Sequence, residues 1–598
     1  MGVQPVLALK RLAVCSLAAL LCGPPALYAK QTPSPKHGGQ LEDGNPAHRK
    51  DTKKSSKHDR MLHDQERDRT APINFGFGVN VKPPGGKINW RHADAKTSPT
   101  QQTTQFRTSA APLAAAIPSG PNAATNGTFG PVIPWPIIPI HLGLLPDGRV
   151  ISYGSDENGA QTGQLNYDLW TPSQGQGVEA HILLSNQTTT DLFCSGFGGM
   201  PDGRMLITGG DNTINGARNY ANSSVNVFDP TQNALNPAGN MLYARWYSTV
   251  VPLPDGTSLL AGGIGYGPND TQDVLNPITI PELYDPASGL YLFPDADNGG
   301  TVEWFYPRLF VSSDSSIYNL DPSGLVSTYS TVGNGSFRTL GTFLDTSTVA
   351  NPSVMFAPGQ VLSVRRPDTI TGTTQTHLVD VVDLTGNVPV VGQSNSVPGG
   401  GREWANATLL ADGQVFVNGG SGEDNTETRV SYDSYIWNPA TGTWSLGGTA
   451  QNERLYHSTS LLLPDASVLT GGGGAPGPVN QLNAEIYYPP YLYDKDGNPA
   501  PRPALVSATA LAQAGTPITL TMGAADPISR VTFLRIGAVT HSFNPQQRVF
   551  NLPFTQDGTT VTAQLPTNGN DLLPGYYMVF AFGAGGTPSV AQFTQIAP

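Results

Sequence analysis

The sequence predicts an all-β protein, and three features of its composition lead to this prediction. The 598 residues include 68 Gly and 53 Pro, which is typical of a chain with many tight turns. Charged residues make up only 13% of the chain, whereas coiled coils and long helices depend on Glu, Lys and Arg. Apolar residues reach 38%, with 21 Tyr and 21 Phe, which is enough for a large hydrophobic core. Helical bundles and low-complexity chains are therefore excluded.

The first 29 residues have the features of a secretory signal peptide. Lys10 and Arg11 precede an apolar run over 12–22, and small residues close the segment at Ala29. The run is about half the length of a membrane span, and no later stretch approaches the roughly 20 apolar residues that one requires. We therefore predict cleavage after 1–29 and a secreted protein, extracellular, periplasmic or attached to the cell surface, without a membrane span.

Residues 30–124 are predicted to be a disordered, charged tether and a lead-in to the folded body. The part over 30–70 holds ten Lys or Arg against seven Asp or Glu and no Phe, Tyr or Trp. Its four histidines fit a solvated linker better than a metal site. Because the whole chain has a net charge of −12, the remaining body is acidic and would repel nucleic acid and anionic membranes.

One phrase recurs along the body of the chain: a short apolar run, a turn rich in Pro, Asp and Gly, a second apolar run, and paired glycines. The turns of its seven copies are at Asp147, Asp202, Asp255, Asp314, Pro358, Asp412 and Asp465. They lie 44 to 59 residues apart, and a period near 50 with double glycines is typical of the kelch type of β-propeller. Asp-Gly favours a tight hairpin, and paired glycines allow close strand packing. We predict a seven-bladed kelch-type β-propeller over 125–490.

The repeat does not continue into residues 491–598. This segment contains alternating apolar strands such as VTFLRIG and YYMVFAF, with turn signals about every 8 to 12 residues. The pattern predicts a second domain, an immunoglobulin-like β-sandwich of the early-set kind.

The three cysteines of the chain lie in two different predicted segments. Cys15 and Cys22 lie in the predicted signal peptide, so Cys194 is the single cysteine of the mature protein. Secreted proteins usually pair their cysteines. Cys194 is therefore either a buried small hydrophobe or a residue kept for the chemistry of its sulfur.

Three residues lie at the same distance before the turn of their blade. Cys194, Tyr247 and His457 each precede their turn by eight residues, so they occupy equivalent points around the central channel. Tyr456 and His457 are neighbours on a strand, and both side chains can face one ion only where the strand is irregular. Imidazole nitrogens with phenolate oxygens suit Cu(II) better than zinc or magnesium. Taken singly, each histidine also fits an ordinary core or surface position.

Four motifs, in this order, carry a resemblance to a known family: FCSG, RWYST, RLYHSTSLLLPD and VTHSFNPQQR. They resemble the copper radical oxidases, the family of galactose oxidase and glyoxal oxidase, and the resemblance spans residues 125–598. It implies one copper ion whose ligands are Tyr247, Tyr456, His457 and His541, the last supplied by the sandwich domain. It also implies a self-processed thioether between Cys194 and the ring of Tyr247, which carries a radical. Tyr456 would be the axial ligand and the base.

The resemblance gives weaker guidance on the surroundings of the copper. In galactose oxidase an indole shields the radical; the best local alignment puts Tyr291 at that place, and Trp304 is a second candidate. Arg365, Arg366 and Arg402 lie in predicted loops at the propeller mouth. Arginine forks there suit a sugar diol or a carboxylate, and the alternative is that they are solvated loop charges.

The family resemblance implies an oxidase that converts a primary alcohol or an aldehyde hydrate to the aldehyde or acid while O2 is reduced to H2O2. RWYS and FCSG are more similar to glyoxal oxidases, and TGGGGAPGPVNQLNAEIYYPPYLY is more similar to galactose oxidase, so both substrate classes stay open. A rival function is a non-catalytic propeller that binds glycans or extracellular matrix. We expect a monomer whose partners are a small alcohol, sugar or aldehyde and O2, without nucleic acid or membrane.

Overall fold

The computed structural model describes residues 92–93, 113, 115–212, 221–271, 274–368, 376–399 and 401–598, with the side chains of 92, 93, 366–368 and 376 left undescribed. The predicted signal peptide and most of the predicted tether lie outside these residues. The helices of the described part are short: α2 (Ala123–Asn126), η1 (Pro172–Gln174), η2 (Val178–Ala180), η3 (Pro294–Ala296) and η4 (Pro490–Leu492). No helix there has the length and apolar character that crossing a bilayer requires.

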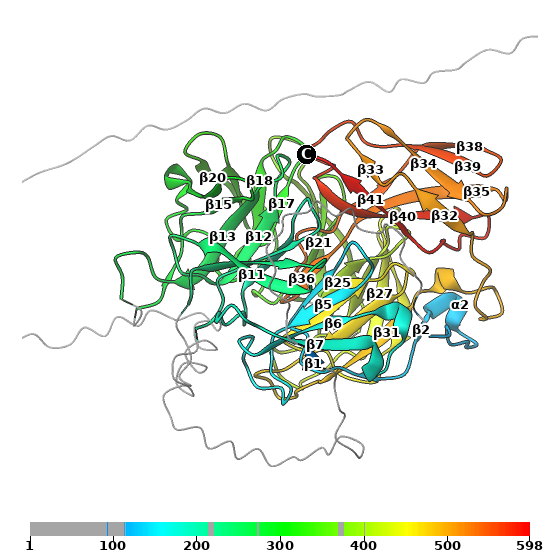
Figure 1. Cartoon of the computed structure of the whole chain (residues 1–598), viewed down its shortest axis with the longest axis horizontal. Helices are drawn as coiled ribbons and strands as arrows, with labels where there is room; N and C mark the ends of the chain where they lie inside the picture. The colour runs from blue at the N-terminus through cyan, green and yellow to red at the C-terminus, as the bar shows by residue number, and fades with distance from the viewer. Residues whose placement is uncertain are drawn as a thin grey trace, which may run out of the picture. The chain divides into compact units, whose positions relative to one another are not determined.

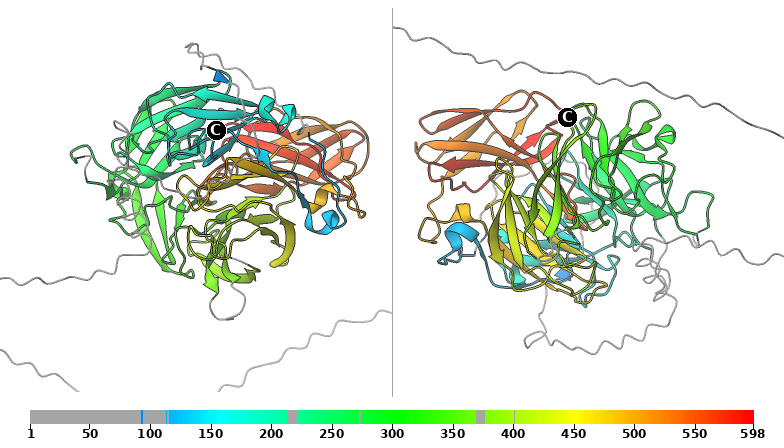
Figure 2. Two further views of the ribbon diagram at one scale, coloured as in Figure 1. Left: turned by 90° about the horizontal axis from the view of Figure 1, so that it is seen from below. Right: turned by 180° about the vertical axis from the view of Figure 1, so that it is seen from behind.

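Seven successive sheets, each built on four antiparallel strands in up-and-down order, form the propeller (Figure 1 and Figure 2). Blade 1 contains β4 (His141–Leu144), β5 (Val150–Tyr153), β6 (Asn166–Trp170) and β7 (His181–Ser185), with β1 (His92–Ala93) parallel to β7. Blade 2 contains β8 (Gly196–Gly199), β9 (Met205–Thr208), β10 (Ser224–Asp229) and β11 (Ala234–Asn240). Blade 3 contains β12 (Trp246–Pro252), β13 (Ser258–Gly265), β15 (Glu282–Asp285) and β16 (Gly289–Leu292), with β14 (Asn276–Pro277) beside β13.

The remaining blades follow the same order. Blade 4 contains β17 (Leu309–Val311), β18 (Ile317–Leu320), β19 (Leu325–Ser330) and β20 (Ser336–Thr342). Blade 5 contains β21 (Ser353–Ala357), β22 (Gln360–Asp368), β23 (Thr376–Asp383) and β24 (Val390–Val397). Blade 6 contains β25 (Asn406–Leu409), β26 (Val415–Asn418), β27 (Asp433–Asn438) and β28 (Thr443–Thr449). Blade 7 contains β29 (Ser458–Leu462), β30 (Val468–Gly472) and β31 (Asn483–Tyr488), with β2 (Thr128–Phe129) and β3 (Ile133–Pro134) paired to β31.

Blade 7 is completed by strands from opposite ends of the propeller sequence. Thr128 of β2 pairs with Tyr488 of β31, so backbone hydrogen bonds close the ring of blades. Buried apolar clusters fill the spaces between blades, as expected for sheets that pack face to face. The all-β fold predicted from the sequence, a seven-bladed propeller followed by a sandwich, is confirmed.

The paired glycines of the repeat serve close packing between blades, as predicted. Gly419 has a φ of 72°, and a Cβ there would lie 2.6 Å from the carbonyl oxygen of Arg454 in the next blade. Gly209, with a φ of 64°, approaches the carbonyl of Arg245 even more closely. A side chain at either glycine would push neighbouring blades apart.

The C-terminal domain is a sandwich of two sheets, coloured orange to red in Figure 1. One sheet contains β32 (Leu505–Ala508), β34 (Pro517–Met522), β39 (Thr560–Gln564) and β38 (Phe554–Asp557). The other contains β33 (Leu511–Ala512), β41 (Gln592–Ile596), β40 (Gly575–Gly583), β35 (Ile528–Arg535) and β37 (Val549–Asn551). A separate apolar core lies between them.

Residues 536–548, which connect two sandwich strands, form what we call the axial hairpin. Its strand β36 (Ala538–Thr540) pairs with β4, the innermost strand of blade 1, so that Thr540 lies opposite His141. Gln547 accepts a hydrogen bond from the Leu409 backbone at 2.6 Å, and Arg548 donates one to the Val311 carbonyl at 3.0 Å. The hairpin thus enters the propeller channel and is fixed there by blades 1, 4 and 6.

Candidate metal centre

The entrance position, which we define as the residue eight places before each blade turn, has an unusual backbone in five blades. These residues, with φ between 40° and 68°, are Cys194, Tyr247, Tyr306, Trp404 and His457. A left-handed conformation costs a residue other than glycine about 1 to 3 kcal/mol, and such residues cluster at functional sites. The equal offset in the sequence therefore corresponds to one repeated local structure at the inner edge of the propeller.

Backbone hydrogen bonds link the entrance positions of neighbouring blades. The amide of Tyr247 donates to the carbonyl of Cys194 at 2.9 Å, and the amide of Tyr306 donates to the carbonyl of Tyr247 at 2.9 Å. The amide of Trp404 donates to the carbonyl of Ala350, the entrance residue of blade 5, at 3.1 Å. These bonds fix the strained residues and direct their side chains into one buried cluster.

Blade 7 brings two consecutive side chains to this cluster. The rings of Tyr456 and His457 stack with centroids 3.7 Å apart and an interplanar angle of 27°. Both are about 1% exposed. The φ of 68° at His457 breaks the strand alternation that would otherwise send the two rings to opposite faces. The irregularity that the sequence required is therefore present at this residue.

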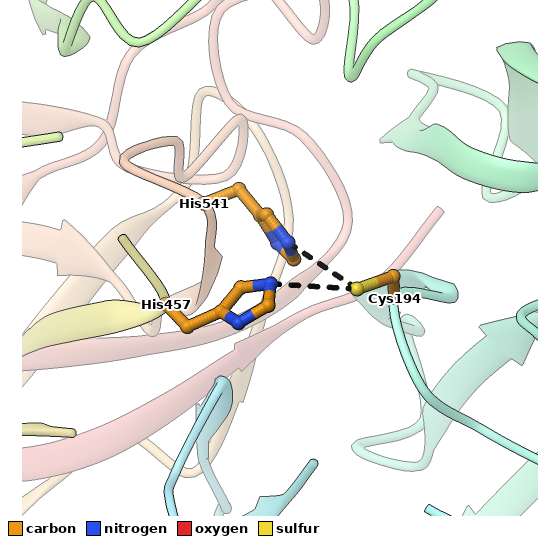
Figure 3. Close-up of side chains that lie close together, drawn as sticks. All are labelled: Cys194, His457 and His541. Carbon is orange, nitrogen blue, oxygen red and sulfur yellow. Dashed lines mark hydrogen bonds between the residues drawn. The ribbon is translucent and has the colours of Figure 1, made fainter. Parts of the chain in front are cut away.

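The sulfur of Cys194 lies between two imidazoles that come from different domains (Figure 3). Its Sγ is 3.6 Å from Nε2 of His457 and 3.4 Å from Nε2 of His541. His541 follows β36 in the axial hairpin, and its ring is fully buried. The three ligand atoms lie within 4.8 Å of one another, which is close enough to contact a single metal ion.

Hydrogen bonds at the other ring nitrogen select, for the neutral form of each imidazole, the tautomer whose Nε2 carries no proton. His457 donates from Nδ1 to the Gly474 carbonyl at 2.7 Å. The Thr540 hydroxyl donates to the Ile140 carbonyl, so at 2.6 Å it accepts a proton from Nδ1 of His541. Burial, followed by the nearby His457, lowers the pKa of His541 well below its usual value and keeps it neutral. Such contacts are typical of metal-binding histidines.

Two phenol groups complete the donor set. The Tyr456 hydroxyl donates to the Tyr247 hydroxyl at 3.2 Å, and both residues are buried. The ring of Tyr247 meets His541 edge-on at 5.5 Å. Two neutral imidazoles, two phenols and a thiol at one buried point form an N, O and S set that suits copper. Hard cations such as Mg²⁺ and Ca²⁺ prefer oxygen ligands alone.

The aromatic cover of Tyr247 differs from the sequence prediction. Phe305 lies 4.6 Å from its ring at 32°, Trp246 lies 4.5 Å away at 28°, and Trp304 lies farther off at 6.1 Å. Tyr291, in contrast, is 47% exposed on β16, the outermost strand of the blade. Three strand spacings, or about 14 Å, separate it from β12. Tyr291 therefore does not shield Tyr247.

Two arginines for which the sequence left open a substrate contact or a solvated loop position have structural roles instead. Arg365 donates to the carbonyls of Asp345 and Asp321 at 2.8 and 2.9 Å. Arg402 donates to the carbonyls of Gly419 and Asp433, both at 3.0 Å. Both are buried, and burial lowers the pKa of each to about 10. They hold propeller backbone rather than face a substrate, while the side chain of Arg366 lies outside the described part.

Replacing Arg402 by lysine should therefore destabilise the propeller without altering substrate binding. Lysine lacks the fork that reaches two carbonyls, so we expect a loss of about 2 kcal/mol in unfolding free energy. Denaturant unfolding and the KM of the folded variant measure the two effects. A raised KM with unchanged stability would restore the substrate role.

Sequence reasoning missed several residues of the cluster. Tyr306 and Trp404 stand eight residues before Asp314 and Asp412, so the offset that identified Cys194 could have identified them as well. Trp404 lies over the ring of Tyr456, with centroids 4.4 Å apart. Phe305 and Trp246 carry no such signal, because they are only chain neighbours of entrance residues.

Comparisons with known proteins find similarity to copper and aldehyde oxidases. Residues 502–596 match the family model "Galactose oxidase-like, Early set domain". The chain is 29% identical over 498 residues to galactose oxidase of Gibberella zeae, covering 79% of this chain and 70% of that protein. It is 23% identical over 490 residues to aldehyde oxidase GLOX1 of Arabidopsis thaliana, covering 72% and 75%.

A solved structure extends the similarity to three dimensions. It is described as a novel fungal alcohol oxidase with catalytic diversity among the AA5 family, in complex with copper. The match has a TM-score of 0.68 at 26% identity and covers 79% of this chain and all of that one. Together with the buried centre built from Cys194, Tyr247, Tyr456, His457 and His541, these matches support the resemblance of the chain to the copper radical oxidase family.

Proposed function

We propose that this protein is a secreted mononuclear copper radical oxidase that oxidises a primary alcohol or an aldehyde hydrate and reduces O2 to H2O2. The observation that carries the proposal is that the Cys194 sulfur and the Nε2 atoms of His457 and His541 lie close together. Hydrogen bonds at Nδ1 fix both rings in the tautomer whose Nε2 is available to a metal. A copper oxidoreductase acting on alcohols or aldehydes is the enzyme class that the family relationship supports.

Tyr247, Tyr456, His457 and His541 would hold the copper. When bound, copper supplies one of the two one-electron acceptors that oxidation of an alcohol requires. Tyr247, as a phenoxyl radical, would be the other, and it would take the hydrogen atom from the carbon that bears the oxygen. Tyr456, whose hydroxyl oxygen lies 3.2 Å from that of Tyr247, would take the substrate's hydroxyl proton in its phenolate form, which the charge of bound copper would favour. O2 then receives two electrons and two protons and leaves as H2O2.

The radical on Tyr247 would be stabilised by a thioether to Cys194. In that step the S–H bond and one ring C–H bond break, a C–S bond forms, and O2 accepts the two electrons and two protons as H2O2. The proposal is supported by the adjacent, hydrogen-bonded backbones of the two residues and by their burial in one cluster. A thioether also explains how a secreted chain carries a single cysteine in its body.

The reaction can be tested with a peroxide-coupled screen of the copper-loaded protein over galactose, glycerol, benzyl alcohol, methylglyoxal and glyoxal. We expect peroxide from at least one substrate, at a rate proportional to bound copper, and none from the copper-free protein. Absence of peroxide from every substrate by a fully copper-loaded preparation would contradict the oxidase and favour a non-catalytic, glycan-binding propeller.

A further inference from the structure

The backbone carbonyl of Ser195, the residue after the candidate cross-linking cysteine, accepts hydrogen bonds from side chains of two other blades. The Ser195 carbonyl accepts hydrogen bonds from the Tyr306 hydroxyl at 3.0 Å and from Nε2 of His141 at 3.2 Å. The Ser195 hydroxyl bonds that of Tyr153 at 2.9 Å. All four residues are buried, and Ser195 directly follows Cys194. The position of Cys194 therefore depends on blades 1 and 4 as well as on its own blade 2.

Tyr306 also contacts the opposite side of the centre. Its ring stacks on the imidazole of His541 with centroids 4.4 Å apart at 29°, and it meets Tyr247 edge-on at 5.6 Å. One side chain thus contacts a candidate copper ligand and the candidate radical ring. Through its hydroxyl it also holds the peptide next to Cys194.

The backbone of Tyr306 is itself fixed in this place. Its φ is 40°, and its amide donates to the Tyr247 carbonyl at 2.9 Å. Arg308 donates to the carbonyl of Tyr306 at 2.8 Å and to that of His541 at 3.3 Å. Tyr306 is therefore anchored to the axial hairpin through both its ring and its backbone.

We propose that Tyr306 is a positioning residue that sets the Cys194 sulfur and the His541 imidazole in register before copper binds. This inference rests on the proposed function and deepens it. The Tyr306 hydroxyl is used in a hydrogen bond to the Ser195 carbonyl, so we assign it a positioning role and no part in proton transfer or copper binding. Its role is to hold the sulfur where, with O2 as the oxidant, the C–S bond to Tyr247 can form.

The hydroxyl of Tyr306 can be removed with a matched control in the same blade. Tyr318 is also 2% exposed, and its hydroxyl donates to the Gly386 carbonyl at 3.1 Å. Copper-free full-length protein is mixed with Cu(II) and air, and the change in gel mobility caused by the thioether is followed in time. We expect Tyr306→Phe to cross-link about 10- to 100-fold more slowly, and Tyr318→Phe to cross-link at the original rate. Equal rates in the two variants would overturn the proposal.

The ring of Tyr306 is tested by copper binding, which does not depend on the cross-link. Tyr306→Leu should raise the dissociation constant for Cu(II) about 10-fold or more and change the nitrogen hyperfine pattern in electron paramagnetic resonance. Tyr318→Leu should change neither the dissociation constant nor the spectrum. If the original protein binds copper but never cross-links, the proposed thioether is refuted. The copper affinities of Tyr306→Leu and Tyr318→Leu then still decide whether Tyr306 positions His541. An unchanged dissociation constant and spectrum in Tyr306→Leu would refute that role.

Discussion

Replacing Cys194 by serine will leave a folded protein that still binds copper but produces peroxide at least about 10³-fold more slowly. Serine is close in size to cysteine, so the buried cluster keeps its packing. A hydroxyl, however, cannot form the thioether that makes the Tyr247 ring easier to oxidise. Without that bond the second one-electron acceptor of the reaction is lost. The peroxide rate per bound copper measures the effect.

The control for this variant is Ser248→Ala, which changes a buried side chain directly after Tyr247. It should keep both the cross-link and the peroxide rate within a small factor of the original protein. If Cys194→Ser were as active as Ser248→Ala, the sulfur would have no part in the reaction, and the oxidase would have to use another oxidisable group.

Replacing His541 by alanine will lower the affinity for Cu(II) by at least about 100-fold while the propeller and the sandwich stay folded. The loss is expected because His541 is the one candidate ligand that comes from the sandwich domain. Folding is preserved because the axial hairpin is also held by β36 and by Gln547 and Arg548. Copper titration and circular dichroism measure the two properties separately.

His377 supplies a matched control, since it is also a buried histidine of the described part. Its Nδ1 bonds the Arg365 carbonyl and its Nε2 accepts from the Arg402 amide, each at 2.9 Å, so it holds backbone in blades 5 and 6. His377→Ala should cost stability and leave copper affinity unchanged. Equal copper affinity in His541→Ala and His377→Ala would contradict the hairpin's role in the centre.

Much of this architecture could be predicted from the sequence, because the propeller repeats its local structure. The seven turn anchors correspond to seven blades, and the offset of eight residues corresponds to the left-handed entrance positions. The same backbone strain that lets Tyr456 and His457 face one point is repeated at Cys194 and Tyr247. A local pattern of this kind is visible in sequence because each blade needs the same turn and the same glycines.

The contacts between blades could not be predicted in the same way. The sequence around Arg402 suggests a charged residue in a loop at the propeller mouth. In the structure its guanidinium donates to two backbone carbonyls, which come together only in the folded blade. Local alignment places Tyr291 beside Tyr247, but Tyr291 lies on β16, which is three places from β12 in the strand order of the sheet. Phe305 packs on Tyr247 because blade 4 adjoins blade 3. No local sequence pattern indicates this contact between blades.

Peptide mass spectrometry of the copper- and air-treated protein tests the central claim most directly. The account predicts one cross-linked species that joins the peptide containing Cys194 to the peptide containing Tyr247, lighter by two hydrogen atoms than the two separate peptides. The same species should be absent from copper-free protein and from the Cys194→Ser variant. Two separate, unmodified peptides from a fully copper-loaded and peroxide-producing enzyme would contradict the account.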